Sequence, residues 1–284
     1  PIERGRMSLD YQKAFDFTTK NFIITGGAGV LGSRISQNLC ECGANVVVLD
    51  LNLDAAEKLV NRLNKDHGTT QATALPCDVL DAESVRGAVD GVIEKYGFID
   101  GLINGAGGNK AAASTSEIAS FFDLPQDAIR WVFDLNLIGT IIPSQVVGRV
   151  MAEQKEGVIL NISSMNAFRP LTRIPAYSAA KAGVSNFTQW LAVHMAQEYS
   201  PRIRVNAIAP GFFMTQQNRF LLFDSETGEL SDRGQRIIDH TPMGRFGDPE
   251  DILGTTLWLL SSASAFVTGV VIPIDGGFSA FSGV

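Results

Sequence analysis

A tyrosine and a lysine with the spacing of neighbours on a helix stand in the segment "SSMNAFRPLTRIPAYSAAK". Tyr177 and Lys181 are four residues apart, so on a helix their side chains share one face. A free phenol titrates near ~10, and a lysine ammonium beside it favours the phenolate and lowers that pKa. The pair predicts a general acid or base that works near neutral pH, although the same spacing also arises by chance.

Two further polar residues could complete such a centre. Ser164 lies 13 residues before Tyr177, at the end of a predicted strand, where its hydroxyl could bind a carbonyl or alcohol oxygen. Asn136, in "FDLNLIG", could hold a water that links Lys181 to solvent, or could only satisfy backbone groups at a helix irregularity. Together the four residues predict proton transfer to or from a carbon-bound oxygen.

A glycine-rich stretch is a candidate phosphate site. "TGGAGVLG", residues 25–32, follows an apolar strand-like run, and three of its glycines fit the pattern G-x-G-x-x-G. Glycine lets backbone N–H groups approach an anion at the start of a helix, whereas the alternative is a plain tight turn. The cofactor contacts that we predict in this loop are Gly26, Gly29, Val30, Leu31 and Gly32.

Acidic and small residues end the strands that follow. Asp50 closes "NVVVLD", 18 residues after Gly32, where a carboxylate can accept hydrogen bonds from ribose hydroxyls, although an ordinary capping aspartate is the alternative. A carboxylate there would repel a 2′-phosphate, and residues 25–32 hold no Arg or Lys, so NAD is favoured over NADP. Further predicted cofactor contacts at strand ends are Asp78, Val79, Asn104, Gly105 and Ala106.

Alternating apolar strands and helices must position these residues. Strands are predicted at 22–25, 46–50, 72–77, 101–104, 158–163, 204–208 and 270–274. Helices are predicted at about 30–43, 53–67, 81–96, 126–154, 175–199 and 248–262. Several strands are apolar throughout, as expected when both faces are covered. The pattern predicts an α/β fold, a single doubly wound parallel sheet of about seven strands with helices on both faces and ligands at the strands' carboxyl ends.

Composition narrows the possible classes of protein. The chain of 284 residues is 45% hydrophobic and carries a net charge of −7, which favours a folded domain and argues against a nucleic-acid partner. Three cysteines without a pairing framework favour a reducing, cytoplasmic setting, and three scattered histidines argue against a metal site. The uncharged span 252–274 could cross a bilayer by length, but its serines, glycine and proline favour a buried helix and strand, so no membrane partner is expected.

Domain boundaries follow from the same reading. Residues 1–16 are interpreted as an N-terminal extension, of which 1–6 precede Met7 and are interpreted as an expression remnant. Residues 17–284 are predicted to form one Rossmann-type domain. The segment of about 211–247 mixes aromatic, amide and charged residues after a strand end, so it is predicted to be a substrate lid.

The joint order of these motifs resembles the short-chain dehydrogenase/reductase family, over nearly the whole chain from about residue 17. The resemblance implies that Tyr177 is the general acid/base and that Lys181 lowers its pKa and binds the nicotinamide ribose. It implies that Ser164 orients the reacting oxygen and that Asn136 supports a proton relay. Cofactor contacts are also implied at Tyr177, Lys181, Pro210, Gly211 and Thr215, the last of them to the nicotinamide carboxamide.

One residue departs from the family pattern. The usual loop, T-G-x-x-x-G-x-G, would place glycine at position 30, where this chain has Val30. A β-branched residue does not readily adopt a positive φ. We therefore expect either a variant turn or a helix that begins at Val30 in ordinary geometry.

The surroundings of the predicted centre are polar, which bears on the substrate. Arginine can grip a carboxylate and amides can bind hydroxyls, so a polyhydroxy acid is predicted, although exposure to water would explain any one of these residues. The predicted substrate contacts are Asn109, Asn166, Arg169, Arg173, Gln217 and Arg219.

Segments such as "NGAGGNK" and "HTPMGRFG" resemble the D-mannonate oxidoreductase (fructuronate reductase) branch of the family. That resemblance implies reduction of D-fructuronate by NADH to D-mannonate. Gluconate 5-dehydrogenase and other polyol or sugar-acid dehydrogenases remain alternatives. A catalytically silent NAD-binding regulator is an alternative of another class. The presence of all four residues Asn136, Ser164, Tyr177 and Lys181 disfavours it, because a regulator would not need them. Family members usually form tetramers through the two long helices, so a homotetramer is expected.

Overall fold

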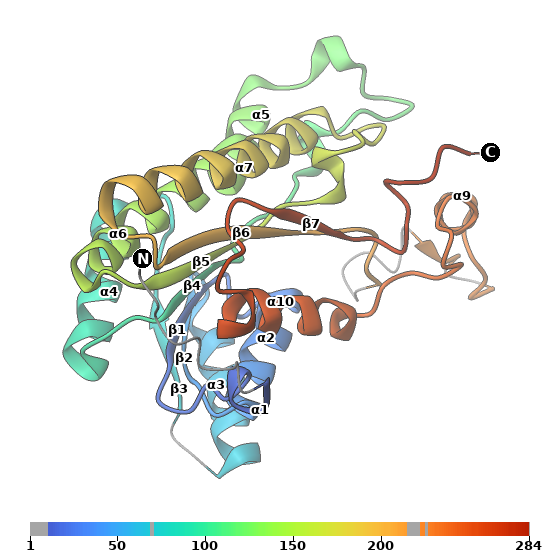
Figure 1. Cartoon of the computed structure of the whole chain (residues 1–284). Helices are drawn as coiled ribbons and strands as arrows, with labels where there is room; N and C mark the ends of the chain where they lie inside the picture. The colour runs from blue at the N-terminus through green and yellow to red at the C-terminus, as the bar shows by residue number, and fades with distance from the viewer. Residues whose placement is uncertain (1–10, 69–70, 215–221, 225–226, 284) are drawn as a thin grey trace, which may run out of the picture.

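The computed structural model describes residues 11–68, 71–214, 222–224 and 227–283. These residues contain one seven-stranded sheet of order β3-β2-β1-β4-β5-β6-β7 (Figure 1), in which every neighbouring pair is parallel. The strands are β1 Asn21–Thr25, β2 Asn45–Asp50, β3 Ala72–Pro76, β4 Gly101–Asn104, β5 Gly157–Ile162, β6 Ile203–Pro210 and β7 Val271–Ile274. The predicted doubly wound α/β fold is confirmed, and the predicted strands lie within a few residues of the observed ones.

The register of the central strands sets the position of the site. β1 lies between β2 and β4, so the strand order reverses between β1 and β4. Thr25, the last residue of β1, pairs with Leu49 on one side and Asn104 on the other. The residues that follow these strands therefore meet at one edge of the sheet, where ligands of such folds bind.

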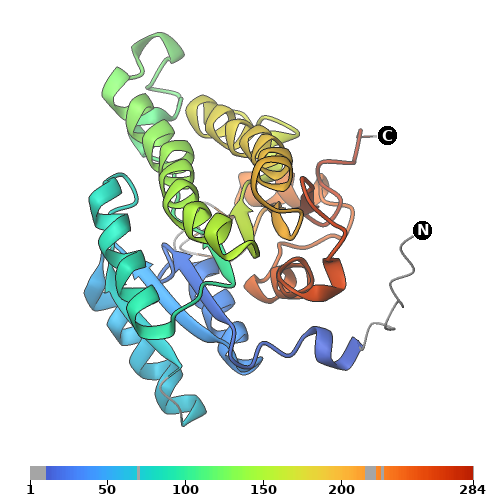
Figure 2. The same ribbon diagram turned by 60° about the vertical axis from the view of Figure 1, so that its left-hand side comes forward.

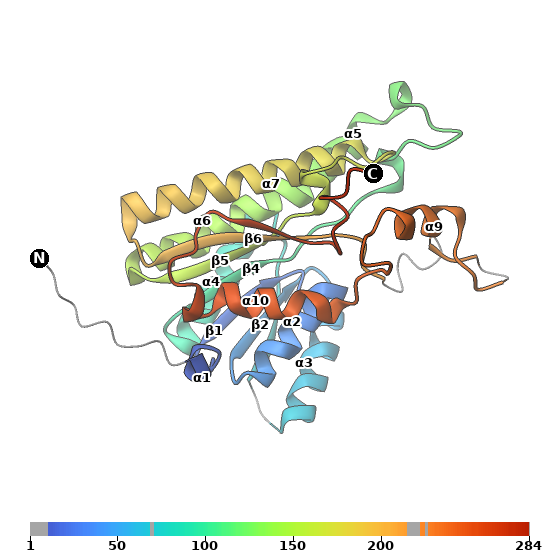
Figure 3. The ribbon, with the colours of Figure 1, turned by 45° about the vertical axis from the view of Figure 1, so that its right-hand side comes forward.

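Helices cover both faces of the sheet (Figures 1 and 3). One face is covered by α2 Val30–Glu41, α3 Leu53–His67 and α10 Leu253–Leu260, and the other by α4 Ala82–Tyr96, α6 Gly139–Gln154 and α7 Pro175–His194. Each layer has its own apolar core, with Ile35, Leu39 and Leu259 in the first and Val92, Met151 and Leu191 in the second. Figure 2 shows α6 and α7 running side by side across their face. The shorter helices are α1 Tyr11–Ala14, α5 Gln126–Phe133 and α9 Asp232–Asp239.

The predicted long helices are confirmed but contain irregular turns. The helix predicted at 126–154 is α5 and α6 joined by a π-turn, Asp134–Ile138, and the one at 175–199 ends in a second π-turn, Met195–Tyr199. Such single π-turns often occur at functional sites. Caps fix the other starts: Asn52 accepts a bond from the Ala55 amide before α3, and Asp81 accepts one from the Glu83 amide before α4.

The run Gln126–Gln154 is long and apolar enough to cross a membrane by length and composition, with a mean hydropathy of 1.2. Within it, however, Val147 and Met151 are fully buried against the sheet layer of this domain. It is therefore a core helix of the α/β fold.

Two of the three cysteines pack in the interior. Cys40, Cys42 and Cys77 are all free, and Cys40 and Cys77 are buried. Burial raises the pKa of the Cys40 and Cys77 thiols to about 11, so both stay protonated and unreactive near neutral pH.

Candidate active site

The glycine loop between β1 and α2 has the geometry of an anion cradle. Gly26 has φ +60°, and a Cβ there would lie 2.7 Å from the Ala106 Cα of the β4 loop. A Cβ at Gly32 would lie 2.6 Å from the Gly26 carbonyl oxygen. Glycine is therefore required at both positions, because the loop, the first turn of α2 and the β4 loop approach one another through backbone alone. This close backbone approach fits a dinucleotide pyrophosphate at the N-terminus of α2.

Val30 begins α2 in ordinary helical geometry. Of the two expected arrangements, a variant turn or a helix that begins at Val30, the structure has the second. Gly29 is the N-cap residue with φ −69°, a value that any residue adopts. The Gly29 amide donates to the Gly26 carbonyl over 3.0 Å and so tightens the turn. The loop thus needs no positive φ at either Gly29 or Val30, and Leu31 continues the first turn of the helix.

Asp50 ends β2 and ties two segments of the crevice together. Its Oδ2 accepts a hydrogen bond from the Ala28 amide at 3.0 Å, and its Oδ1 accepts one from the Asn52 amide at 2.9 Å. The carboxylate is half-buried and borders an open hollow of about 630 Å³ lined by residues 50–54. Both oxygens keep a free lone pair, so the group can still accept hydrogen bonds from ribose hydroxyls.

The other predicted cofactor residues lie along the same edge, with different roles. The Asn104 side chain is buried and donates to Ser144 Oγ and Asn161 Oδ1, while its Oδ1 has no hydrogen-bond partner among the described residues. Gly105 and Ala106 follow it against the glycine loop, and Asp78 and Val79 follow β3. Pro210 ends β6, and Gly211 lies where a Cβ would meet Asp275 at 2.6 Å.

Lys181 is held in the interior by a backbone carbonyl. Its Nζ donates to the Ile162 oxygen, at the end of β5, over 2.7 Å, and the side chain is only 4% exposed. Burial lowers the pKa of Lys181 to about 8. Near neutral pH the ammonium is still the major form, but it lies within reach of deprotonation.

The sequence predicted a Tyr177 pKa below that of a free phenol, and this is wrong for the structure, where the net shift is upward. Burial raises the pKa of the Tyr177 phenol, and a hydrogen bond with Ser164 opposes that effect only in part. Lys181 Nζ lies 5.8 Å from the centre of the tyrosine ring and is engaged with the Ile162 carbonyl instead. Tyr177 is therefore a protonated phenol near neutral pH, with Ser164 as its hydrogen-bond partner, and it is poised as an acid.

Asn136 occupies the π-turn between α5 and α6. Its Nδ2 donates to the Gly108 and Val132 oxygens at 2.7 and 2.8 Å, and its Oδ1 accepts from the Gly108 amide at 3.1 Å. The side chain thus satisfies the backbone at a helix irregularity and clamps the loop that follows β4. A Cβ at Gly107 would lie 2.8 Å from Asn136 Oδ1 and 3.2 Å from Lys181 Nζ, so the two side chains share one small space.

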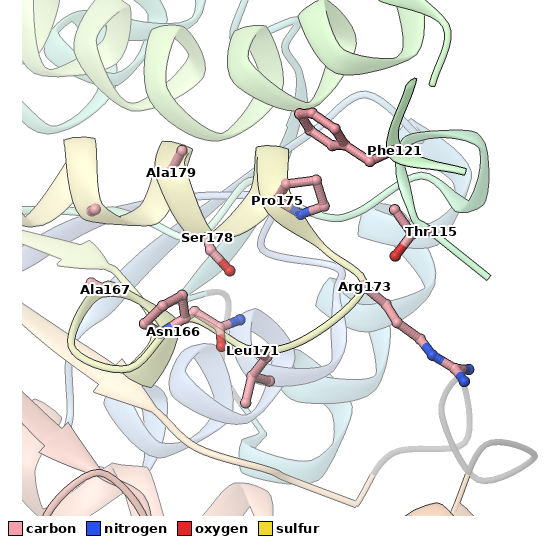
Figure 4. Close-up of a pocket in the computed structure, with 11 residues that line it drawn as sticks. Thr115, Phe121, Asn166, Ala167, Leu171, Arg173, Pro175, Ser178 and Ala179 are labelled. Atoms are coloured by element: carbon pink, nitrogen blue, oxygen red, sulfur yellow. The ribbon is translucent and has the colours of Figure 1, made fainter. Parts of the chain in front are cut away.

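A cavity of about 510 Å³ is lined by residues close in sequence to Ser164 and Tyr177, though not by these two side chains themselves (Figure 4). Asn166 and Ser178 lie on one wall, Thr115 and Phe121 lie opposite, and Arg173 extends from the loop before α7. The buried Asn166 Oδ1 and Ser178 Oγ have no hydrogen-bond partner among the described residues. Two unpaired polar atoms at a cavity wall are available to a polar ligand.

The remaining predicted substrate residues divide clearly. Asn109 is exposed and donates to Ser114 Oγ, and Arg169 donates from Nε to the Ser279 carbonyl at 3.1 Å, so both are engaged within the chain. Gln217 and Arg219 lie outside the described residues, as does Thr215, which was predicted to contact the cofactor. Sequence reasoning missed Ser178 as a neighbour of the centre, although it directly follows Tyr177.

The described part of the chain contains no candidate metal site. Among the described residues, no group of three or more His, Cys, Asp or Glu side chains is placed to hold a metal ion.

Comparison with known proteins agrees with this geometry. The family model described as enoyl-(acyl carrier protein) reductase matches residues 27–279. An uncharacterised oxidoreductase from Haemophilus influenzae is 47% identical over 276 residues, 93% of this chain and 95% of its own. The 5-keto-D-gluconate 5-reductase of Escherichia coli (strain K12) is 32% identical over 264 residues, 93% and 96% of the two chains.

A solved structure extends the comparison to three dimensions. A Haemophilus protein with bound NAD, for which D-mannonate oxidoreductase is a suggested activity, superposes with a TM-score of 0.88 at 46% identity, covering 95% of this chain and 98% of its own. The overall fold therefore agrees with that of this relative. The chain belongs to the short-chain dehydrogenase/reductase family.

Proposed function

We propose that the protein is an NAD-dependent oxidoreductase that reduces a keto sugar acid, D-fructuronate, to the hydroxy acid D-mannonate. The observation that carries the proposed oxidoreductase activity is the group formed by half-buried Tyr177 with buried Ser164 and Lys181 at the carboxyl edge of the sheet, beside the glycine cradle. The sugar-acid reading is supported by the unpaired polar wall of the cavity and by the suggested activity of the Haemophilus relative.

The chain's own residues would handle the proton. When bound, the nicotinamide supplies or accepts the hydride at the substrate carbon. The Ser164 hydroxyl donates a hydrogen bond to the carbonyl oxygen, and the Tyr177 hydroxyl transfers its proton to the alkoxide as it forms. A raised phenol pKa suits this direction, because the group must be protonated at the start and an alkoxide is a stronger base than a phenolate. Lys181, beside Asn136, supplies positive charge that stabilises the phenolate left behind.

NAD is the cofactor that the site supports, and Asp50 would select it. We expect Asp50→Asn to raise the ratio of kcat/KM with NADPH to that with NADH about tenfold, because the variant loses the charge that repels a 2′-phosphate. The matched control is Asp54→Asn, which removes an exposed carboxylate from the same hollow. An unchanged ratio in Asp50→Asn, with NADH still bound, would place cofactor selection elsewhere.

A substrate panel tests the proposed activity directly. NADH oxidation is followed with D-fructuronate, D-tagaturonate and 5-keto-D-gluconate, with NADPH in parallel. The highest kcat/KM is expected for D-fructuronate with NADH. Preference for 5-keto-D-gluconate would favour the alternative of a gluconate 5-dehydrogenase, which the Escherichia coli reductase supports. If the protein binds NADH but reduces none of these substrates, the sugar-acid proposal is wrong. A catalytically silent NAD-binding regulator would then be the better explanation.

We also propose an oligomeric state, a substrate lid and a cellular compartment for the protein. A homotetramer is supported by large apolar side chains that face solvent in the single chain: Trp190 on α7 is 57% exposed, and Phe266 is fully exposed. Neither side chain is packed in the core of the single chain. We propose residues 211–247, which include α9, as a lid that covers the substrate, and a cytoplasmic setting in keeping with the free cysteines.

A further inference from the structure

Arg173 lies at the mouth of the cavity in an uncommon backbone conformation. Its φ is +74°, in the left-handed region that side chains with a Cβ rarely adopt. Its carbonyl accepts a hydrogen bond from the Thr115 amide at 2.8 Å, which holds the loop in this shape. The side chain extends outward from the cavity residues (Figure 4). Strained residues of this kind concentrate at functional sites, so the position of this guanidinium calls for an explanation.

A second guanidinium, from another part of the chain, interacts with it through its charge. Arg233 lies in the first turn of α9 and is half-buried. The pKa of Arg233 is lowered, first by burial and second by the charge of Arg173, so the two cations are near enough to repel each other. Figure 3 shows α9 beyond the carboxyl ends of the strands, at the same end of the molecule as the start of α7.

Neither cation has a counter-charge within the described part of the chain. Other arginines there do: Arg34 pairs with Glu250, and Arg245 pairs with Asp251 at 2.6 Å. Arg169, close to Arg173 in sequence, is held by the Ser279 carbonyl. Two like charges brought together without an acidic partner are unfavourable unless an anion lies between them.

The cavity wall adds a second, independent indication of a ligand. Asn166 and Ser178 are 6% and 7% exposed, and Asn166 Oδ1 and Ser178 Oγ are buried without a hydrogen-bond partner among the described residues. A ligand with an anionic end and a polyhydroxy chain would satisfy both features: the anion at the arginines and a hydroxyl at the wall.

We propose that Arg173 and Arg233 form a carboxylate clamp that selects sugar acids over neutral sugars of the same shape. The inference rests on the proposed function and deepens it, because it names the residues that would bind the carboxylate of the substrate. Guanidinium groups bind a carboxylate through paired hydrogen bonds, which an uncharged hydroxymethyl group cannot replace.

The test compares an acid with its neutral analogue in both turnover and binding. D-Fructuronate and D-fructose differ at one end, carboxylate against hydroxymethyl, and kcat/KM with NADH is measured for each. Binding of D-mannonate and of mannitol to the complex with NADH is measured by calorimetry, which requires no turnover. The variants are Arg173→Gln and Arg233→Gln, with Arg233→Lys as the charge-conserving form. Arg236→Gln, which removes an exposed charge from the same helix, is the matched control.

We expect each glutamine variant to lower the ratio of kcat/KM for D-fructuronate to kcat/KM for D-fructose by a factor of about ten to a hundred. This is the effect of losing about one charge-assisted hydrogen bond. D-Mannonate binding should weaken by a similar factor, Arg233→Lys should recover part of it, and Arg236→Gln should stay within about twofold of the parent. Thermal unfolding and NADH binding of each variant confirm that it is folded.

The outcomes separate the clamp from the proposed function. Reduction of D-fructuronate with unchanged ratios in both glutamine variants would overturn the clamp and leave the function standing. Binding of D-mannonate that depends on both arginines, in a protein that reduces no keto sugar acid, would support the clamp and overturn the function. Equal binding of D-mannonate and mannitol by the unsubstituted protein would overturn the clamp whatever its activity.

Discussion

Tyr177→Phe is expected to lower kcat for ketone reduction by about 10² to 10⁴, the range that a positioned general acid contributes. The substitution removes one hydroxyl and leaves the ring, which packs beside Ala176 and the α5 residues Ala128 and Val132, in place. The glycine cradle and Asp50 do not touch the hydroxyl, so NADH binding should change little. Stopped assays with saturating NADH and substrate measure the loss in kcat, and fluorescence titration of NADH measures cofactor binding.

A matched control exists in the same chain. Tyr96 lies at the end of α4, and its hydroxyl shares a hydrogen bond with Thr73 Oγ1 at 3.1 Å, away from the site. Tyr96→Phe removes an equivalent group and should keep near-parental turnover. Should Tyr177→Phe do the same with a confirmed substrate, the proton would have to come from another group, and the assignment of the general acid would fall.

The fold was predictable because its signals are local and repeated. Continuous apolar runs such as those of β1 and β2 indicated buried parallel strands, and the helical segments between them left a doubly wound sheet as the simple solution. The residues at strand ends could then be placed at one edge, since the carboxyl ends of parallel strands coincide. Thr25, Asp50 and Asn104 lie there in the register that this argument requires.

The electrostatics of the centre could not be predicted in the same way. Helical spacing correctly placed Tyr177 and Lys181 on one face, but not the Ile162 carbonyl that takes the ammonium, since that contact joins α7 to β5. Burial then controls both pKa values, and burial depends on packing that no spacing encodes. The nearness of Arg233 to Arg173 was not predictable for a related reason, since it depends on how α9 packs against the rest of the chain.

Lys181→Met is expected to abolish most of the turnover and to change how stability depends on pH. In the folded protein burial lowers the lysine pKa from 10.5 to about 8, so the unfolded chain binds this proton more tightly than the folded one. Between about pH 8 and 10.5 the unfolded state therefore carries the extra proton, and the free energy of unfolding of the parent rises with pH. At about 1.4 kcal/mol per pH unit, the gain is at most on the order of 3 kcal/mol.

Methionine has a similar length and no charge, so the variant lacks this titration. It also leaves the Ile162 carbonyl without its donor, at a cost of about 1–3 kcal/mol that does not depend on pH. Urea unfolding at intervals from pH 7 to 10.5 should therefore show the stability of Lys181→Met falling relative to the parent as pH rises. Lys58→Met, at an exposed lysine on α3, should run parallel to the parent. Parallel curves for Lys181→Met would mean that the ammonium is not destabilised by burial. The Lys181 ammonium would then be as well solvated as that of a surface lysine. Its charge would be too strongly screened to stabilise the Tyr177 phenolate as proposed.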